Sequence, residues 1–245
     1  MANQALAQVG AMNDATMKYT LRYKLGWRWR LASVWVRYVL VGQFQGVPAL
    51  VDFALSNRYF TAYQVRSELA ALGEILAEHR PERALEIGTA RGGTLLFLTR
   101  LADPKATIVS VDLPDGMFGG GYSARRKRYY QRFARRGQRL HLLQGDSHSA
   151  EMLGQVKAAL KDQPLDYLFI DGDHRYEGVK HDFEMYAPLV RKGGVIAFHD
   201  IVEGPPENVG GVPQYWRELK AHHRHSEFIH DPKQGGCGIG LLYVD

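Results

Sequence analysis

Short apolar runs alternate along this chain with longer stretches in which apolar residues recur every three or four positions. The runs at 84–87, 107–111 and 165–170 are rich in aliphatic and β-branched residues, which is typical of buried strands. Apolar residues at helical spacing over 93–101 and 149–160 predict helices between them. Strands that alternate with helices predict an α/β fold with a parallel sheet.

The same alternation extends over the rest of the chain from residue 63. Further strands are predicted at 140–144 and 195–198, near 227–229 and at 238–244. Further helices are predicted at 63–79, 123–136, 179–189 and 213–221. With 245 residues and 45% apolar content, the chain is long enough to bury one full core. We therefore expect one domain over residues 58–245, preceded by an extension.

The predicted extension, residues 1–57, contains no cofactor motif. Its segment 19–41 interleaves tryptophan and tyrosine with arginine and lysine, a mixture that suits an interface. Three roles for such a helical extension stay open: a cap over the substrate pocket, a dimerisation interface, and an amphipathic arm on a membrane surface. Helices packed on the domain, with arginine side chains that reach solvent, are the alternative without a binding role.

The first predicted strand of the domain runs into a turn of small residues. Gly88, Ala90 and Gly92 let the backbone turn sharply and approach a ligand closely, because bulky side chains would fill the space. Asp112 ends the next predicted strand, where a carboxylate can accept hydrogen bonds from ribose hydroxyls. This strand, turn, helix and strand therefore predict a site for a nucleoside-bearing cofactor.

This turn differs from the dinucleotide pattern G-x-G-x-x-G, because an acid, Glu86, stands two residues before Gly88. The pattern E-x-G-x-A-x-G, followed by an acid at the end of the second strand, resembles the first two motifs of class I S-adenosylmethionine-dependent methyltransferases. The resemblance implies a Rossmann-like seven-stranded sheet with helices on both faces and an antiparallel last strand. It also implies an S-adenosylmethionine site, with Asp146 near the adenine. The implied cofactor-binding residues are Glu86, Gly88, Thr89, Ala90, Gly92, Thr94, Asp112, Asp146, Ser147 and Asp171.

Two later strands are predicted to deliver polar clusters to the same edge of the sheet. Asp171 and His174 follow the fourth strand, and His199 and Asp200 follow the fifth. Methyl transfer to a hydroxyl needs the acceptor close to the donor and help in losing its proton. A divalent cation between Asp171 and Asp200 would lower the pKa of the acceptor, and His174 is the predicted base.

These clusters resemble a metal-dependent branch of small-molecule O-methyltransferases, including macrocin O-methyltransferase-like and cephalosporin hydroxylase-like (CmcI-type) proteins and, more distantly, catechol O-methyltransferase. The matching segments are 169–179 and 193–200. The resemblance implies metal ligation by Asp171 and Asp200, with His174 as base. This chain has His199 where the family usually has an acid or amide. His199 then either joins the ligands, which favours manganese or zinc over magnesium, or faces the acceptor as a catalytic group.

The sequence therefore predicts a methyltransferase that acts on a hydroxyl of a small molecule, a sugar or another polyhydroxylated metabolite of secondary metabolism. A nucleic-acid methyltransferase that uses the basic segment 123–139 is one alternative. It is disfavoured because the fourth strand does not end in the Asn/Asp-Pro-Pro-Tyr/Phe turn of exocyclic-amine methylases. A cofactor-binding module without turnover and an oxidoreductase on the same scaffold also stay open.

Charge and cysteine content bear on the partners and the cellular location expected for this chain. The net charge of +5 is modest, and basic residues gather at 125–139 on what is either a solvated helix face or a surface for an anionic partner. The single cysteine, Cys237, cannot form an intrachain disulfide and is predicted to be an ordinary packed thiol. Without a leader or a long apolar run, the cytoplasm is the expected location.

The glycine-rich segment 114–122 is predicted to be a mobile rim or lid. Whether the protein forms a homo-oligomer stays open.

Overall fold

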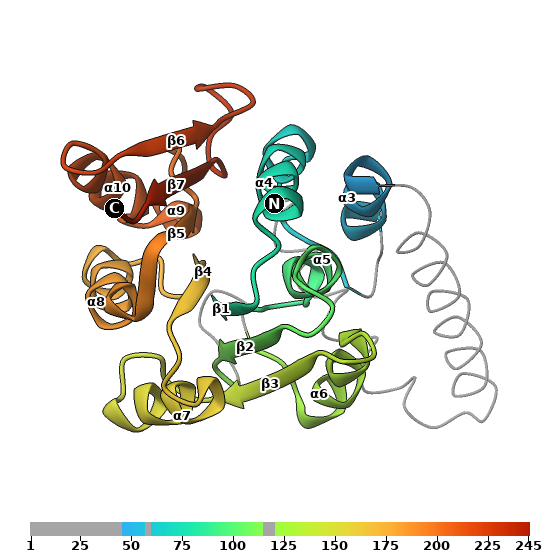
Figure 1. Ribbon diagram of the computed structural model, residues 1–245. Helices are drawn as coiled ribbons and strands as arrows, with labels where there is room; N and C mark the ends of the chain where they lie inside the picture. Colours follow the sequence, from blue (N-terminus) through green and yellow to red (C-terminus); the bar gives the residue numbers. More distant parts are fainter. Residues whose placement is uncertain (1–45, 57–59, 115–120) are drawn as a thin grey trace, which may run out of the picture. The chain divides into compact units, whose positions relative to one another are not determined.

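The predicted alternation of strands and helices is confirmed by a computed structural model, which describes residues 46–56, 60–114 and 121–245 (Figure 1). Val47–Asp245 forms one compact unit, which begins before the boundary predicted at residue 58. The roles predicted for residues 1–57 stay predictions, and residues 1–45 lie outside the described part. So do residues 115–120 of the predicted lid. None of the helices in the described part is long and apolar enough to cross a membrane.

A seven-stranded sheet forms the centre of the domain, with the strand order β3-β2-β1-β4-β5-β7-β6. Neighbouring strands from β3 to β5 are parallel, whereas β7 is antiparallel to both β5 and β6. This confirms the Rossmann-like sheet with an antiparallel last strand. The strands are β1 (Arg83–Ile87), β2 (Thr107–Asp112), β3 (Arg139–Gln144), β4 (Leu165–Ile170), β5 (Val190–His199), β6 (His225–Phe228) and β7 (Ile239–Tyr243).

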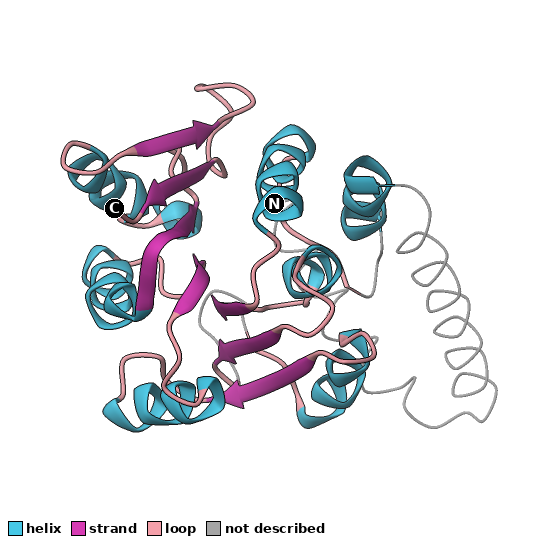
Figure 2. Cartoon of the chain, in the orientation of Figure 1, coloured by secondary structure: helices cyan, strands magenta, loops and turns pink. Residues whose placement is uncertain are grey.

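Helices cover both faces of the sheet (Figure 2). Apolar residues of α7, α8 and α10 pack on one face, against residues such as Leu85, Ile170 and Phe198. Residues of α4 and α5 line the other face beside Tyr167 and Phe169. The helices are α3 (Gly46–Ser56), α4 (Arg66–His79), α5 (Gly93–Leu101), α6 (Ala124–Tyr130), α7 (Ala150–Leu160), α8 (Tyr176–Tyr186), α9 (Pro206–Val209) and α10 (Val212–Lys220).

Several element boundaries differ from those predicted. The helix predicted over 123–136 ends at Tyr130 and continues as a 3-10 turn, because Ala134 leaves the helical conformation with ψ 130°. Helix α8 ends at Tyr186, also in a 3-10 turn, where Pro188 has no N–H to continue the helical ladder. Strand β5 begins at Val190, earlier than predicted. Helix α9 lies where no helix was predicted, and α3 lies within residues 1–57, which were predicted to be helical.

The strand order places the candidate residues at one edge. Strand β1 lies between β2 and β4. The chain places β2 and β3 on one side of β1 and then crosses over to place β4 and β5 on the other side. Ligands of open α/β sheets bind outside the carboxyl ends of the strands at this kind of switch point. The carboxyl ends of β1, β2, β3, β4 and β5, or the turns that follow them, bear the candidate acids and histidines: Glu86, Asp112, Asp146, Asp171, His174, His199 and Asp200.

Candidate active site

The turn after β1 depends on backbone conformations that favour glycine. Gly88 and Gly92 have φ values of +87° and +80°, and Ala90 has a φ of +45°. A Cβ atom on Gly88 would lie 1.9 Å from the carbonyl oxygen of Asp171. The close approach that the structure shows at Gly88 is therefore to the backbone after β4. It joins the predicted cofactor turn directly to the segment that carries the candidate catalytic residues.

The carboxylate of Asp112 holds this turn in place. Its Oδ2 accepts hydrogen bonds from the backbone N–H groups of Thr89 and Ala90, at 3.0 and 2.7 Å. Its Oδ1 accepts one from the N–H of Leu113, at 2.8 Å. Burial raises the pKa of Asp112, although these backbone hydrogen bonds oppose the shift. The backbone of Gly121 also donates a hydrogen bond to this carboxylate, so four backbone N–H groups hold Asp112, and its contact with a ribose stays a prediction.

Glu86 lies beneath the turn, within the domain. Its side chain is 1% exposed, and Thr89 Oγ1 donates a hydrogen bond to Glu86 Oε2 at 3.1 Å. Burial raises the pKa of Glu86 to about 8, despite hydrogen bonds from Thr94 and Thr89 that lower it. The carboxyl group is therefore mainly protonated at pH 7. Glu86, Thr89 and Thr94 support the turn from inside, and their contact with a cofactor stays a prediction.

Tyr130 of α6 covers the turn from the outside. Its hydroxyl donates a hydrogen bond to the carbonyl of Ala90 at 3.0 Å, and a Cβ on Gly92 would lie 2.8 Å from the Tyr130 ring. Tyr122 meets Tyr130 edge to face, with ring centroids 5.1 Å apart. Tyr130 is fully buried. Its contact with the turn was missed, because spacing indicates a buried side chain but not its neighbour.

The turn after β3 presents Asp146 to solvent. The Asp146 side chain is 64% exposed, and its Oδ1 accepts a hydrogen bond from the N–H of His148 at 2.9 Å. The hydroxyl of Tyr186 donates to the carbonyl of Ser147 at 2.7 Å, which ties this turn to α8. Asp146 and Ser147 are thus placed at the same edge as Asp112, and their roles near an adenine stay predictions.

The residues after β4 and β5 form one cluster of carboxylates and imidazoles. His199 Nδ1 lies 3.3 Å from both Asp171 Oδ1 and Asp200 Oδ2. His174 Nε2 lies 3.5 Å from Asp171 Oδ1, and His174 Nδ1 lies 3.5 Å from Asp200 Oδ2. His199 and Asp200 are 6% and 8% exposed. The structure therefore brings together the four residues predicted to act on the acceptor.

The carbonyl of Asn208, in α9, sets the orientation of His174. His174 Nδ1 is hydrogen-bonded to this carbonyl, and because a carbonyl only accepts, Nδ1 carries the proton. Nε2 is then the nitrogen whose lone pair can take a proton or bind a metal. Gly210 and Gly211 let the chain pass close to the backbone of His174 and Tyr176. The contact between α9 and His174 was missed, because residues 206–209 were predicted to be a loop.

Opposite charges within this cluster shift its pKa values strongly. Burial would lower the pKa of His174, but Asp171 and Asp200 raise it to about 9. Burial likewise opposes a raised pKa of His199, and Asp171 and Asp200 again raise it well above the usual value. Burial would raise the pKa of Asp171, but His199 and His174 lower it to about 2. Two imidazolium protons thus balance two buried carboxylates.

This donor set fits a divalent cation. Ligand atoms of Asp171, His174 and Asp200 lie within 4.8 Å of one another, and so do those of His199, Asp200 and Cys237. A dication between the carboxylates would replace two imidazolium protons without a change in total charge. His199 Nε2 is buried and makes no hydrogen bond of normal length and angle in the described part of the chain. Cys237 was predicted to be an ordinary packed thiol, and only the fold brings it to this cluster.

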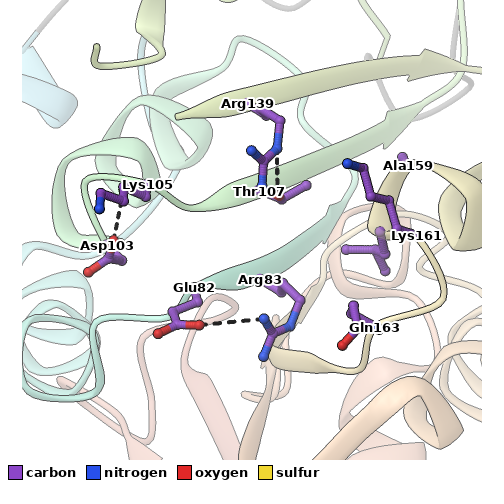
Figure 3. Close-up of a pocket in the computed structure, with 10 residues that line it drawn as sticks. Glu82, Arg83, Asp103, Lys105, Thr107, Arg139, Ala159, Lys161 and Gln163 are labelled. Carbon is purple, nitrogen blue, oxygen red and sulfur yellow. Dashed lines mark hydrogen bonds and ion pairs between the residues drawn. The ribbon is translucent and has the colours of Figure 1, made fainter. Parts of the chain in front are cut away.

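A basic cavity of about 260 Å³ lies at the opposite edge of the sheet (Figure 3). Arg83, Thr107 and Arg139, the first residues of β1, β2 and β3, contribute to its lining together with Lys105 and Lys161. Arg139 is hydrogen-bonded to the hydroxyl of Thr107. Arg139 belongs to the basic segment predicted as a possible surface for an anionic partner, but none of the predicted cofactor, metal or catalytic residues lines this cavity.

Comparisons with known proteins agree with the fold. Residues 85–201 match a family model described as a methyltransferase domain. An O-methyltransferase from Bacillus cereus, solved in complex with SAH, is similar with a TM-score of 0.55 and 19% identity, over 81% of this chain and 89% of that chain. The O-methyltransferase TomG from Streptomyces achromogenes, involved in tomaymycin synthesis and solved with SAM, is similar with a TM-score of 0.52 and 19% identity, over 89% of this chain and 98% of that chain. At such identities the likeness establishes the fold.

Sequence matches to curated proteins are short. A segment of 80 residues is 39% identical to the uncharacterized protein y4gI of Sinorhizobium fredii, over 33% of this chain. A segment of 36 residues is 56% identical to an uncharacterized protein of Acanthamoeba polyphaga mimivirus, over 15% of this chain. The matches span only 8% and 16% of the length of these relatives.

Proposed function

This chain carries a methyltransferase domain of the class I fold, and from that premise we propose that it is an S-adenosylmethionine-dependent O-methyltransferase of small molecules. One observation carries the proposal. Asp171 belongs both to the wall of the predicted cofactor turn, through its contact with Gly88, and to the cluster of carboxylates and imidazoles. This shared residue supports the proposal, because an in-line transfer requires the donor site and the acceptor site to be adjacent.

The turn after β1 is the proposed methyl-donor site. Asp112, at the carboxyl end of β2, is the proposed partner of the ribose, and exposed Asp146 is the proposed partner of the adenine. Similar folds solved with SAM or SAH support this choice of cofactor over NAD. Gly88 and Gly92 let the turn pack closely against the backbone of Asp171 and the ring of Tyr130, which fixes the position of the proposed donor site.

The cluster after β4 and β5 is the proposed acceptor site. His174 Nε2 is the proposed base, because Asn208 holds the proton on Nδ1. Asp171, Asp200 and His199, whose Nδ1 lies 3.3 Å from both carboxylates, are the proposed ligands of a divalent cation, whose charge would lower the pKa of the acceptor hydroxyl and return His174 to its neutral form. Buried His199 and Asp200 exclude water on the side away from the acceptor. Polyhydroxylated metabolites, including sugars, are the proposed acceptors, because adjacent hydroxyls can chelate such a cation.

The first prediction tests methyl transfer itself. We expect the purified protein to transfer label from methyl-labelled S-adenosylmethionine to an acceptor in a panel of sugars, polyols and catechols. Asp200→Asn and His174→Ala should lower turnover by about 100-fold or more, because metal binding or proton removal is lost. Cofactor affinity, measured by calorimetry, should stay within about threefold, because neither side chain belongs to the donor turn.

Asp162→Asn is the matched control, because Asp162 is an exposed acid after α7. Its turnover should equal that of the native protein. Labelling of RNA or DNA in place of every small molecule, together with binding that weakens steeply with salt, would make nucleic acid the substrate. Tight cofactor binding without turnover on any acceptor would favour a binding module. Binding of NAD instead of S-adenosylmethionine would remove the proposal.

The second prediction concerns the metal. Thorough chelation should lower turnover by about 100-fold, and a divalent transition metal should restore it. The measurement is the rate of label transfer before and after the metal is returned. Turnover that is unchanged after complete metal removal, verified by elemental analysis, would limit the site to acid–base chemistry by His174.

A further inference from the structure

Cys237 occupies a backbone position that suits glycine. Its φ is +58°, in the left-handed region, and its neighbours Gly235, Gly236 and Gly238 have φ values of +76°, +131° and +81°. A residue with a Cβ atom is strained in this region, whereas glycine is not. Cys237 therefore occupies a position where glycine would be less strained, which points to a function of its thiol.

The backbone of Cys237 is fixed against the end of β5. The N–H of Cys237 donates a hydrogen bond to Asp200 Oδ1 at 2.9 Å, and its carbonyl accepts one from the N–H of Val202 at 3.0 Å. Asp200 also has a left-handed backbone, with a φ of +59°. Strand β7 pairs with β5 antiparallel, from His199 opposite Ile239. This pairing brings Cys237 to the candidate active site from a distant part of the sequence.

The imidazole of His199 supplies an independent observation. It is 6% exposed, and its Nδ1 faces the carboxylates of Asp171 and Asp200. Its buried Nε2 makes no hydrogen bond of normal length and angle among the residues that the structure describes, and the side chain of Cys237 also interacts with this ring. A buried polar atom without a well-formed hydrogen bond destabilises the fold. A nitrogen of this ring, a carboxylate oxygen of Asp200 and Sγ of Cys237 lie within 4.8 Å of one another.

We propose that Cys237, as a thiolate, forms with His199 and Asp200 a site for a borderline-soft transition metal such as Zn²⁺. Thiolate, imidazole and carboxylate are the ligands that zinc takes, whereas Mg²⁺ and Ca²⁺ select oxygen. Three protein ligands leave a tetrahedral position for water or for the acceptor oxygen, as in catalytic zinc sites. In this ligand set Cys237 replaces Asp171 as the third protein ligand, and Asp171 and His174 then lie beside the metal as the groups that face the acceptor.

This inference rests on the proposed function in that it assigns the metal of the same site. Metal binding can nevertheless be measured without methyl transfer. The thiol must lose its proton to solvent when the metal binds, so affinity should rise with pH until the thiolate is fully formed. No oxidation or group transfer is involved in this step.

The third prediction uses the fact that Cys237 is the single cysteine of the chain. Metal-free full-length protein is titrated with Co²⁺, which substitutes for zinc and absorbs light. We expect a thiolate-to-cobalt charge-transfer band in the near ultraviolet that Zn²⁺ abolishes and Mg²⁺ does not. No other residue can give this band. Cys237→Ser should lose it and should bind Zn²⁺ at least about tenfold more weakly.

Cys237→Gly separates loss of the ligand from loss of folding. Glycine relieves the left-handed backbone, so this variant should be at least as stable as the native protein without metal and should still lack the band. Asp162→Asn should keep it. Alkylation of the half-buried thiol by iodoacetamide should be slowed by equimolar Zn²⁺ but not by Mg²⁺.

Three outcomes would overturn the inference: Co²⁺ binding without the thiolate band, unchanged Zn²⁺ affinity in Cys237→Gly, or no Zn²⁺ binding by the native protein. Failure of the proposed function has a different signature. The band would then be present while no acceptor in the panel is methylated. A protein that methylates an acceptor but shows no band keeps the function and loses the thiolate ligand.

Discussion

At the scale of residues, two acids of the candidate site, Glu86 and Asp171, differ in their ionisation state. Glu86 is buried beside hydroxyl groups, so burial decides and raises its pKa to about 8. Asp171 is also largely buried, but His199 and His174 lower its pKa to about 2. The charged partner, not the depth of burial, decides which carboxyl is ionised at pH 7. The neutral acid supports the cofactor turn, and the charged acid faces the proposed acceptor.

The fourth prediction follows from the raised pKa of Glu86. Between about pH 4.5, where the unfolded carboxyl ionises, and about pH 8, the folded protein binds the extra proton. The free energy of unfolding of the metal-free protein should therefore fall as pH rises through this window. Glu86→Gln should remove a slope of about 1.4 kcal/mol per pH unit, because the amide does not ionise. Urea unfolding at a series of pH values measures this slope.

Glu78→Gln is the control for this measurement, because Glu78 is an exposed acid of α4. It should keep the native slope. His174, whose pKa is raised to about 9, contributes stability below its unfolded pKa that is lost as pH rises through about 9, so some slope should persist in Glu86→Gln. Parallel curves for the native protein and Glu86→Gln would contradict the assignment of a neutral Glu86.

At the scale of elements, the turn after β1 is held from three sides. Asp112 of β2 binds its N–H groups, Tyr130 of α6 lies on Gly92, and the backbone after β4 lies against Gly88. Helix α5 begins next to this turn, and a Cβ on Gly93 would lie 2.1 Å from the backbone nitrogen of Ala62. The glycines therefore allow strands and helices to approach one another, in addition to any approach by a ligand.

The fifth prediction compares two glycine-to-alanine substitutions. Gly88→Ala places a Cβ 1.9 Å from a backbone oxygen at a φ of +87°, so it should destabilise the domain by about 2 kcal/mol or more. Gly154→Ala adds a methyl group to an exposed position of α7 with nothing within 4 Å. It should stabilise the domain by about 0.5–1 kcal/mol. Chemical unfolding measures both, and equal effects would contradict the proposed packing of the turn.

At the scale of the whole domain, the two edges of the sheet have opposite character. The carboxyl ends of β1, β2, β4 and β5 gather acids and histidines, whereas arginine and lysine side chains line the cavity at the amino ends. The proposed cofactor carries a positive sulfonium and amino group, which suits the acidic edge. Because these strands are parallel, the candidate active site lies at their carboxyl ends and the basic cavity lies at their amino ends.

The sixth prediction concerns stabilisation of the whole domain by its cofactor. S-adenosylmethionine at about 100 times its Kd should raise the free energy of unfolding by about 2.7 kcal/mol, because it binds only the folded state. NAD at the same concentration should have no effect. Thermal unfolding with and without each compound is the measurement. Asp112→Ala should lose the response to S-adenosylmethionine, and a native protein that responds to NAD alone would refute the choice of cofactor.

The sequence by itself determined the order of strands and helices and the turn after β1. These depend on local properties: apolar spacing, β-branched content and small residues at a turn. It also indicated that Asp171, His174, His199 and Asp200 follow parallel strands at one edge, because strand ends are visible along the chain. The antiparallel last strand came from the family resemblance, and the topology confirms it.

Tertiary structure decided what could not be read from neighbours in the sequence. The pairing of β7 with β5 brings Cys237 to His199 and Asp200, α9 brings Asn208 to His174, and α6 lays Tyr130 on the turn. Each contact joins segments far apart along the chain, and local spacing carries no information about such distances. Burial also decided that Glu86 is neutral, because the pKa of a carboxyl depends on the charges and solvent that the fold leaves around it.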